Sequence, residues 1–400
     1  MEKVLEGIRV LDFGRFIAAP YCGMMLADMG AEVIRIDRPG GEEDRSVGLK
    51  ASNGENMSYP SYARNKKAIS LNLLTKENDQ AYEILSDLVK KSDVVLQNFS
   101  PGAIKHFGLE YDDFKGMKED IIYAGISCYG SDGPYHDRNG FDQIAQSFSG
   151  AAYLSGFPEH GPLRSALPWV DYSTGLCTAN GILLALRHRD KTGEGQAVDC
   201  ALLQTAISFM APMIAEAEVL GRERPQLGNR AAYFGPTDLY ECADGHVYIA
   251  TTMEGMWVRL MKLIGHEELL DDPGAKTDMD RYENRERIDP FVVEWMKAHT
   301  KEEVVAAMEE NRIPCGIVNR TNEVADDPHV KHRKMLEYSD LEEPGLNEVP
   351  ICGMPVRLSK SPGAVETRAP RVGEHNDYFY GEVLGYSQEK IEGLSAAGVI

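Results

Sequence analysis

The sequence predicts an α/β protein in which a large Rossmann-like domain is accompanied by a second, smaller α+β domain. In the first half of the chain, short apolar segments alternate with amphipathic ones, which is typical of strands and helices in a parallel sheet. The 400 residues exceed the roughly 250–300 residues that one hydrophobic core usually spans, so a second domain is expected. From residue 237 onward a hairpin signal followed by helices replaces the alternation, which places the smaller domain there.

The first strand is predicted over residues 8–13, where an apolar run ends at Gly14. A helix over 21–29, closed by Gly30, and a second strand over 32–37 complete a βαβ unit. The pattern then repeats, with a helix over 77–91, strands over 94–97 and 121–126, and a long helix over 172–189. This alternation implies a layered, Rossmann-like architecture.

A linker is predicted over 222–236, where proline, glycine and charged residues interrupt the periodic pattern. Strands over 239–242 and 247–251 flank Ala243-Asp244-Gly245, a turn sequence typical of a hairpin. The helices that follow are predicted over 254–264, 282–298 and 301–311. Residues 237–334 therefore form the predicted small domain, and proline and glycine return after it.

Composition and charge exclude several classes of protein. The chain has 42 basic and 63 acidic residues and a net charge of −21, which argues against a nucleic-acid partner, because phosphate contacts need a basic surface. No stretch approaches the ~18 apolar residues of a membrane span, and the acidic N-terminus lacks the apolar segment of a secretory signal. We therefore expect a cytoplasmic protein with no membrane partner. The seven cysteines are scattered and form no Cys/His cluster, so no metal site is predicted.

The turns after the predicted strands are candidate ligand sites. Residues 12–20 contain one glycine where a dinucleotide fingerprint needs three, so NAD and FAD are not expected. This turn still brings a helix start to the carboxyl end of a strand, which suits an anion, although an ordinary connection has the same appearance. Residues 98–103 are open to the same two interpretations, and the glycine-rich loop over 129–142 either lines a site or is only a turn.

Arg38 follows the second predicted strand and stands beside Pro39-Gly40-Gly41. An arginine there can hold a phosphate or stack on a base, and the alternative is a solvated surface charge. Arg64, Lys66 and Lys67 add positive charge nearby in the sequence. Together these residues predict a basic corner on an otherwise acidic protein.

Asp171 stands at the start of the long predicted helix. As a structural residue it would be the helix N-cap. As a functional residue it would be an ionised carboxylate, kept charged by the helix dipole and the free amides, and able to act as a covalent nucleophile toward an acyl group. The two interpretations are compatible, and both stay open from the residues alone.

Several segments, each commonplace alone, occur in a specific order: 5–12, 30–37, 64–71, 171–175, 192–196 and 313–316. In this order they resemble the family III CoA-transferases, the group of formyl-CoA transferase and carnitine CoA-transferase. The resemblance runs from Leu5 to His375, nearly the whole chain.

The resemblance implies that residues 1–221 and 335–400 build the large domain together, and that two chains interlock in a homodimer. It also implies a reaction on acyl-CoA and carboxylic-acid substrates. In the family, the aspartate matching Asp171 attacks an acyl-CoA thioester, and CoA reaches a free acid through aspartyl anhydride and aspartyl-CoA intermediates. Coenzyme A is then part of the substrates, and no tightly bound cofactor is expected.

Further residues of this chain match binding positions of the family. Arg38 matches the cation near the CoA nucleotide, and Asp142 matches an acidic residue close to the catalytic aspartate. The positions that line the CoA channel correspond to Ala18, Leu71, Asn98, Phe99 and Ala103, with His106 standing where an arginine is common. Ile17 replaces a glutamine of formyl-CoA transferase, and 229–235 lacks that enzyme's glycine run, so an acid other than formate or oxalate is expected.

Two alternative functions remain. The same fold hosts α-methylacyl-CoA racemases, which use a histidine in a Gly-His-Asp sequence, but the corresponding residues here are Gly140-Phe141-Asp142. Phenylalanine carries no proton, so that route lacks a partner. In a non-enzymatic nucleotide-binding or scaffolding protein, Asp171 would be only a cap. The sequence does not name the acid, although Ile17, Phe141 and Tyr233 indicate a less polar pocket than oxalate needs.

Overall fold

A computed structural model describes residues 3–51, 56–73, 79–342 and 345–400. Its contacts divide the chain into two compact units. The large unit consists of Met1–Ala151, Ser165–Ala211 and Pro328–Ile400, and the small unit consists of Ala152–Arg164 and Pro212–Asp327. The sequence predicts a large domain over 1–221 and 335–400, a linker over 222–236 and a small domain over 237–334. These bounds remain predictions, and the two units are defined by contacts alone.

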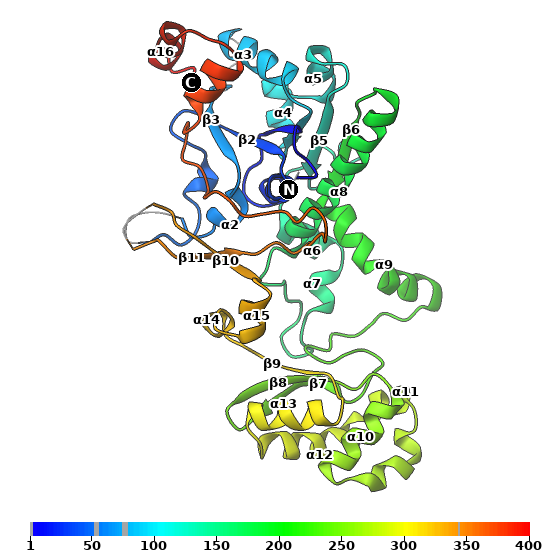
Figure 1. The fold of residues 1–400 in the computed structure, drawn as a ribbon. Helices are drawn as coiled ribbons and strands as arrows, with labels where there is room; N and C mark the ends of the chain where they lie inside the picture. The colour runs from blue at the N-terminus through cyan, green and yellow to red at the C-terminus, as the bar shows by residue number, and fades with distance from the viewer. Residues whose placement is uncertain (1–2, 52–55, 74–78, 343–344) are drawn as a thin grey trace. The chain divides into compact units, whose positions relative to one another are not determined.

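The large unit is built on a six-stranded parallel sheet (Figure 1). Its strands run in the order β3-β2-β1-β4-β5-β6, and the order reverses between β1 and β4. Leu11 of β1 pairs with Ile34 of β2 on one side and with Val95 of β4 on the other. The bounds are β1 Arg9–Asp12, β2 Glu32–Asp37, β3 Lys67–Ser70, β4 Val94–Gln97, β5 Ile122–Ser127 and β6 Ala197–Ala201. The predicted α/β class with a parallel sheet is confirmed.

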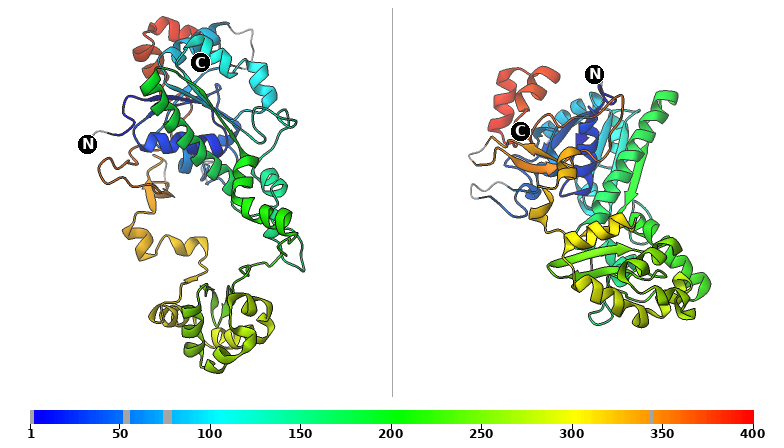
Figure 2. Two further views of the ribbon diagram at one scale, coloured as in Figure 1. Left: turned by 90° about the vertical axis from the view of Figure 1, so that its right-hand side faces the viewer. Right: turned by 60° about the horizontal axis from the view of Figure 1, so that its bottom comes forward.

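Helices cover both faces of this sheet because successive strand residues point to opposite sides. On one face Val10 packs with residues of α1 and α8. On the other face Leu11 packs with residues of α3, α5 and the C-terminal segment, coloured red in Figure 2. The helices of the large unit are α1 Ala18–Asp28, α2 Pro60–Ala63, α3 Asp79–Lys90, α4 Pro101–Phe107, α5 Tyr111–Met117, α6 Asp142–Phe148, α8 Trp169–Thr192, α15 Pro328–His332 and α16 Gln388–Ala396, with a π-helical turn over Asp377–Val383. Two further helices, α7 Ala151–Leu154 and α9 Leu202–Leu220, have residues in both units.

The small unit contains a three-stranded antiparallel sheet, β7 Thr237–Cys242, β8 Gly245–Ala250 and β9 Cys315–Ile317. Cys242 pairs with Gly245, so the hairpin predicted around Asp244 is confirmed. The core of this unit is apolar, with Trp257, Leu260 and Val292 at or near full burial. Its helices are α10 Glu254–Ile264, α11 Asp278–Glu283, α12 Arg285–Lys297, α13 Lys301–Glu310 and α14 Thr321–Val324. A two-stranded antiparallel sheet, β10 Leu336–Ser339 with β11 Val349–Cys352, belongs to the large unit.

Several predicted bounds differ from those of the structure. The helix predicted over 21–29 begins at Ala18, with Pro20 in its first turn, where the missing N–H of proline costs nothing. The long helix begins at Trp169 instead of residue 172. The helix predicted over 77–91 is α3, and positions 77 and 78 lie outside the described residues. In the part of the chain that the structure describes, no helix is long and apolar enough to span a membrane.

Candidate active site

A cavity of about 340 Å³ lies at the carboxyl ends of the parallel strands. Loops that follow β1, β4 and β5 form its walls, and the strand order reverses between β1 and β4. Open parallel sheets bind ligands at such a reversal, because the loops on either side diverge there. The lining residues are Arg15, Phe16, Ile17, Ala18, Asn98, Phe99, Ser100, Pro101, Ile126, Ser127, Cys128, Arg138, Asn139, Gly140, Phe141, Asp171 and Leu202.

Asp171 reaches this cavity from the first turn of α8. The helix begins after Pro168, so Asp171 is its third residue, and the prediction that Asp171 is the N-cap is wrong. Gly175, one turn further on, lies against α1: a Cβ there would stand 2.7 Å from the carbonyl oxygen of Ala18. The absence of a side chain at Gly175 therefore allows α8 to approach α1 and brings Asp171 beside the start of that helix.

Asp142 supplies the cap that Asp171 does not. Its buried carboxylate accepts hydrogen bonds from the backbone N–H groups of Val170 and Asp171, at 2.8 and 3.1 Å. The side-chain amide of Gln146, one turn along α6, donates to its other oxygen. A carboxylate from α6 thus binds the free amides at the start of α8 and fixes the position of Asp171.

Burial raises the pKa of Asp171, and the negative charge of Asp142 raises it further, to about 7. The prediction that the helix start keeps this carboxylate fully ionised at neutral pH is therefore wrong, because the desolvation of a mostly buried group outweighs the helix dipole. A pKa of about 7 leaves Asp171 ionised in part at neutral pH. The ionised form is a more basic carboxylate than an exposed aspartate, and it is better suited to attack a carbonyl carbon.

The loop after β1 is held by side chains of other segments. Asn98 accepts a hydrogen bond from the N–H of Arg15 at 2.7 Å and donates one to its carbonyl at 2.8 Å. The carboxylate of Asp44 accepts the N–H of Phe16, whose backbone has a positive φ of 60°. Ile17, the N-cap residue of α1, provides no side-chain cap, so it leaves the N–H groups of Ala18, in the cavity wall, and of Ala19 uncapped.

The predicted basic corner does not form, because its cations pair with carboxylates. Arg64 binds Asp28 at 2.7 Å and is buried. Lys66 is also buried: its Nζ lies 2.7 Å from the Asp12 carboxylate, and burial lowers the pKa of this lysine. The ammonium of Lys67 binds Glu32 at 2.6 Å, and Arg38 lies 3.8 Å from the carboxylate of Glu42.

The structure brings some of the predicted site residues together and places others elsewhere. Ala18, Asn98, Phe99 and Asp171 line the cavity, and Asp142 contacts the backbone of Asp171. Leu71 is buried just after β3, and Arg38 lies after β2 and lines a different cavity. Ala103 and His106 lie on α4, which follows β4, and neither lines the cavity of Asp171. All of these residues belong to segments that follow the strands, on the carboxyl side of the sheet.

Most of the lining residues were not predicted as site residues, and Arg15, Phe16 and Arg138 are among them. Arg15 and Phe16 lie in the turn over 12–20, and its position after the first strand was the only signal for them. The ring of Phe16 contacts that of Phe141 edge-on, with centroids 6.2 Å apart. Arg138 lies in the glycine-rich loop over 129–142, which the sequence alone does not distinguish from a simple turn.

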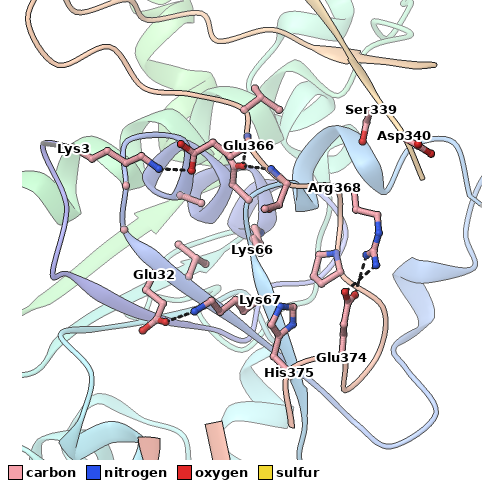
Figure 3. A pocket seen from close by; sticks show the side chains of 18 of the residues that line it. Lys3, Glu32, Lys66, Lys67, Ser339, Asp340, Glu366, Arg368, Glu374 and His375 are labelled. Atoms are coloured by element: carbon pink, nitrogen blue, oxygen red, sulfur yellow. Dashed lines mark hydrogen bonds and ion pairs between the residues drawn. The ribbon is translucent and has the colours of Figure 1, made fainter. Parts of the chain in front are cut away.

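A second cavity lies where β2 and β3 begin, beside Glu32 and Lys67 (Figure 3). Its charged groups neutralise one another: Lys67 pairs with Glu32, Lys3 with Glu366, and Arg368 with Glu374. Figure 3 shows these pairs around its wall. A cavity whose charges are already paired gives a substrate few groups to bind, so we take the cavity of Asp171 as the candidate active site.

Comparison with known proteins shows the family of the chain. Residues 5–376 match the model of CoA-transferase family III. The chain is 32% identical to succinyl-CoA–D-citramalate CoA-transferase of Chloroflexus aurantiacus, with 100% of this chain and 98% of that protein covered. It is 31% identical to succinyl-CoA:glutarate CoA-transferase of Mus musculus, with 100% and 90% covered. A crystal structure of a CAIB/BAIF family protein from Brucella suis superposes with a TM-score of 0.84 at 28% identity, covering 96% of this chain and 100% of that one.

Proposed function

The chain belongs to CoA-transferase family III and is an acyl-CoA:carboxylate CoA-transferase, and we propose that Asp171 carries its reaction as a covalent nucleophile. The observation that supports this role is a mostly buried carboxylate with a raised pKa in the cavity where the strand order reverses. Covalent catalysis divides the transfer of CoA from one carboxylic acid to another into easier steps.

The first half-reaction starts from ionised Asp171 and an acyl-CoA. One Asp171 oxygen bonds to the thioester carbonyl carbon, the C–S bond breaks, and the CoA thiolate leaves a mixed aspartyl anhydride. The thiolate then attacks the aspartyl carbonyl carbon, so that aspartyl-CoA forms and the first acid leaves as a carboxylate. No net proton transfer is required.

The second half-reaction runs through the same bonds in reverse order with another acid. The acceptor carboxylate attacks the aspartyl-CoA carbonyl, the thiolate leaves, and a second anhydride forms. The thiolate then attacks the acyl carbon of the acceptor, which releases the new acyl-CoA and restores ionised Asp171. Asp142 acts here as a positioning residue, because it binds the backbone amide of Asp171 and not its reacting oxygens.

The start of α1 suits the charge that develops on the carbonyl oxygen. Its first amides lack side-chain caps and lie in the wall that contains Ile17 and Ala18. Free amides at a helix N-terminus stabilise an oxyanion, and they do so most in a site from which water is excluded. We assign this role to the first turn of α1.

The rest of the CoA molecule extends, in this proposal, along the carboxyl edge of the sheet. A cavity of about 340 Å³ is near the lower end of the ~300–1,000 Å³ of ligand pockets, so it suits the acyl end alone. Arg38, Leu71, Ala103 and His106 follow β2, β3 and β4 on that edge. The strand order of the sheet is that of Rossmann-like nucleotide-binding folds, which supports this path.

The substrates that we propose are dicarboxylic. Both relatives carry names that specify succinyl-CoA, and citramalate and glutarate each bear two carboxylates. We therefore propose succinyl-CoA as the donor and a short dicarboxylic acid as the acceptor.

A homodimer is also proposed, supported by exposed apolar side chains on the helices beside the site. Leu184 on α8 is 63% exposed and Phe209 on α9 is 53% exposed, and Leu176, Leu183 and Ile207 are exposed as well. Apolar surface of this kind marks protein interfaces. Light scattering is expected to give twice the 44.3 kDa chain mass and to show a shift toward monomer in Leu184→Glu; a monomeric wild-type protein at micromolar concentration contradicts the proposal.

The function is tested by incubating the protein with succinyl-CoA and a panel of free acids, and following new acyl-CoA species by chromatography. CoA exchange is expected with the wild type and is expected to fall at least 1,000-fold in Asp171→Ala, since loss of a covalent nucleophile removes most of the catalysis. Deuterium uptake at the α-carbon without CoA exchange would instead indicate a racemase. Wild-type turnover by Asp171→Ala contradicts the role of Asp171.

A further inference from the structure

Arg138 is a cation in the wall of the Asp171 cavity, and no carboxylate among the described residues pairs with it. It lies in the loop between β5 and α6, four residues before Asp142. Its guanidinium makes no ion pair or hydrogen bond with any residue in the part of the chain that the structure describes. The neighbouring Asp137 pairs with Lys105 at 2.9 Å and lies 3.1 Å from His136.

The other cation of the cavity is already occupied. Arg15 donates to the carbonyl oxygens of Phe13 and Ile36, both at 3.0 Å, and pairs with Glu42 at 2.8 Å. Its hydrogen-bonding groups therefore hold the loop after β1 and are not free for a ligand. Among the described residues that line the cavity, Arg138 is the cation left for a substrate.

An aromatic ring orients the Arg138 guanidinium. The carbon at its centre lies 3.8 Å from the ring centroid of Tyr135, close enough for the guanidinium to stack. Tyr135 is itself held edge-on by Tyr129 and Phe148, at centroid distances of 5.7 and 6.1 Å. A guanidinium stacked on one face keeps its N–H edge open, and that edge matches the two oxygens of a carboxylate.

We propose that Arg138 binds the distal carboxylate of a dicarboxylic acyl group while the other end of that group reacts at Asp171. This inference rests on the proposed function and assigns its specificity to one residue. The apolar remainder of the wall, including the Phe16–Phe141 pair, contacts the carbon chain between the two ends. A monocarboxylic acyl group leaves Arg138 without its partner.

The test compares two CoA thioesters of equal chain length, succinyl-CoA and butyryl-CoA, with acetate as a common acceptor. They differ in the distal carboxylate alone, so any contact with the CoA portion cancels in the ratio of their kcat/KM values. The wild type is expected to prefer succinyl-CoA. Arg138→Gln is expected to lower this ratio about 10- to 100-fold, as for loss of a charge-assisted hydrogen bond, and Arg138→Lys is expected to restore part of it.

Arg357→Gln is the matched control, because it removes an exposed arginine of the large unit that does not line the cavity. Its ratio is expected to equal that of the wild type. If Arg138→Gln lowers kcat/KM by the same factor with both thioesters, Arg138 binds the shared CoA portion and the proposal is overturned. The proposal is also overturned if Arg138→Gln changes neither kcat/KM value. Absence of exchange in the wild type with every thioester and acid contradicts the proposed function itself and is distinguishable from both of these results.

Discussion

At the carboxylate of Asp171, two local effects act in opposite directions on the proton. The start of α8 favours the ionised form by roughly 0.3–1 kcal/mol. Burial and the charge of Asp142 favour the neutral form and raise the pKa from 3.8 to about 7. At about 1.4 kcal/mol per pKa unit this net change is about 4 kcal/mol, so burial and the neighbouring charge exceed the dipole. The result is a carboxylate that is ionised in part at neutral pH and basic when ionised.

The first prediction at this scale concerns pH. If ionised Asp171 is the nucleophile, as proposed, kcat/KM for acyl-CoA is expected to rise about tenfold per pH unit below pH 7 and to level off above it. The measurement is the initial rate of exchange at low succinyl-CoA concentration between pH 5 and 9. A profile that is flat between pH 5 and 7, or that falls as the pH rises, contradicts this role.

Asp142→Asn provides the control for the cause of that pKa. An asparagine oxygen still accepts the amides of Val170 and Asp171, but its negative charge is gone. The midpoint of the pH profile is expected to move below that of the wild type, because the charge of Asp142 raises the pKa of Asp171. An unmoved midpoint would show that this charge has no influence.

The sequence predicts both Asp171 and Asp142 as site residues, but it assigns the cap of α8 to Asp171 instead of Asp142. An aspartate shortly before a helical pattern is the usual sign of an N-cap. The actual cap comes from Asp142, which is 29 residues away in the chain and on another helix. Such a cap depends on the tertiary fold, so no local pattern predicts it. For the same reason the ion pairs of Arg64 and Lys66 could not be predicted, because their buried partners, Asp28 and Asp12, are distant in sequence.

At the scale of elements, the approach of α8 to α1 places Asp171, the proposed nucleophile. Gly175→Ala puts a methyl group within 2.7 Å of the Ala18 carbonyl oxygen, which is backbone and cannot turn away. We expect a loss of about 1–3 kcal/mol in the free energy of unfolding, and a fall in kcat of at least tenfold, because Asp171 moves with the first turn of α8. Denaturant unfolding and initial rates provide the two measurements.

Gly116→Ala is the matched control for this change. Gly116 lies in α5, and a Cβ there meets no atom within 4 Å. This substitution is expected to leave activity unchanged and to stabilise the protein by roughly 0.5–1 kcal/mol, since alanine favours a helix interior more than glycine does. If Gly175→Ala behaves in the same way, the close packing of the two helices is not what places Asp171.

The four central strands of the large sheet, β2, β1, β4 and β5, were predicted, because strands buried on both faces are largely apolar runs. Two strands at the edges of the sheet were missed. β3 begins with a lysine, and β6 contains Asp199 with a partly exposed alternation, so neither has such a run. Edge strands have one neighbour and carry polar residues, and their place in the sheet is set by pairing with β2 and β5.

At the scale of the whole molecule, the order of strands gathers the site from distant segments. Arg15, Asn98, Arg138 and Asp171 come from three connections, those between β1 and β2, β4 and β5, and β5 and β6, and all four line one cavity at the carboxyl ends of the strands. The alternation of elements predicts that edge as the ligand side, and the candidate cavity lies there. It was not sufficient to predict that residues 152–164 group with 212–327, because that grouping depends on contacts between segments separated in the chain.

The central claim is that Asp171 is covalently modified in each cycle, and mass spectrometry of the quenched enzyme tests it most directly. Protein mixed with succinyl-CoA without an acceptor is quenched in acid within milliseconds to seconds and digested. We expect a mass increase, that of CoA thioester or succinyl anhydride, on the peptide that contains Asp171, and none in Asp171→Ala. An unmodified peptide at every time point, in a sample that exchanges CoA, would contradict the account.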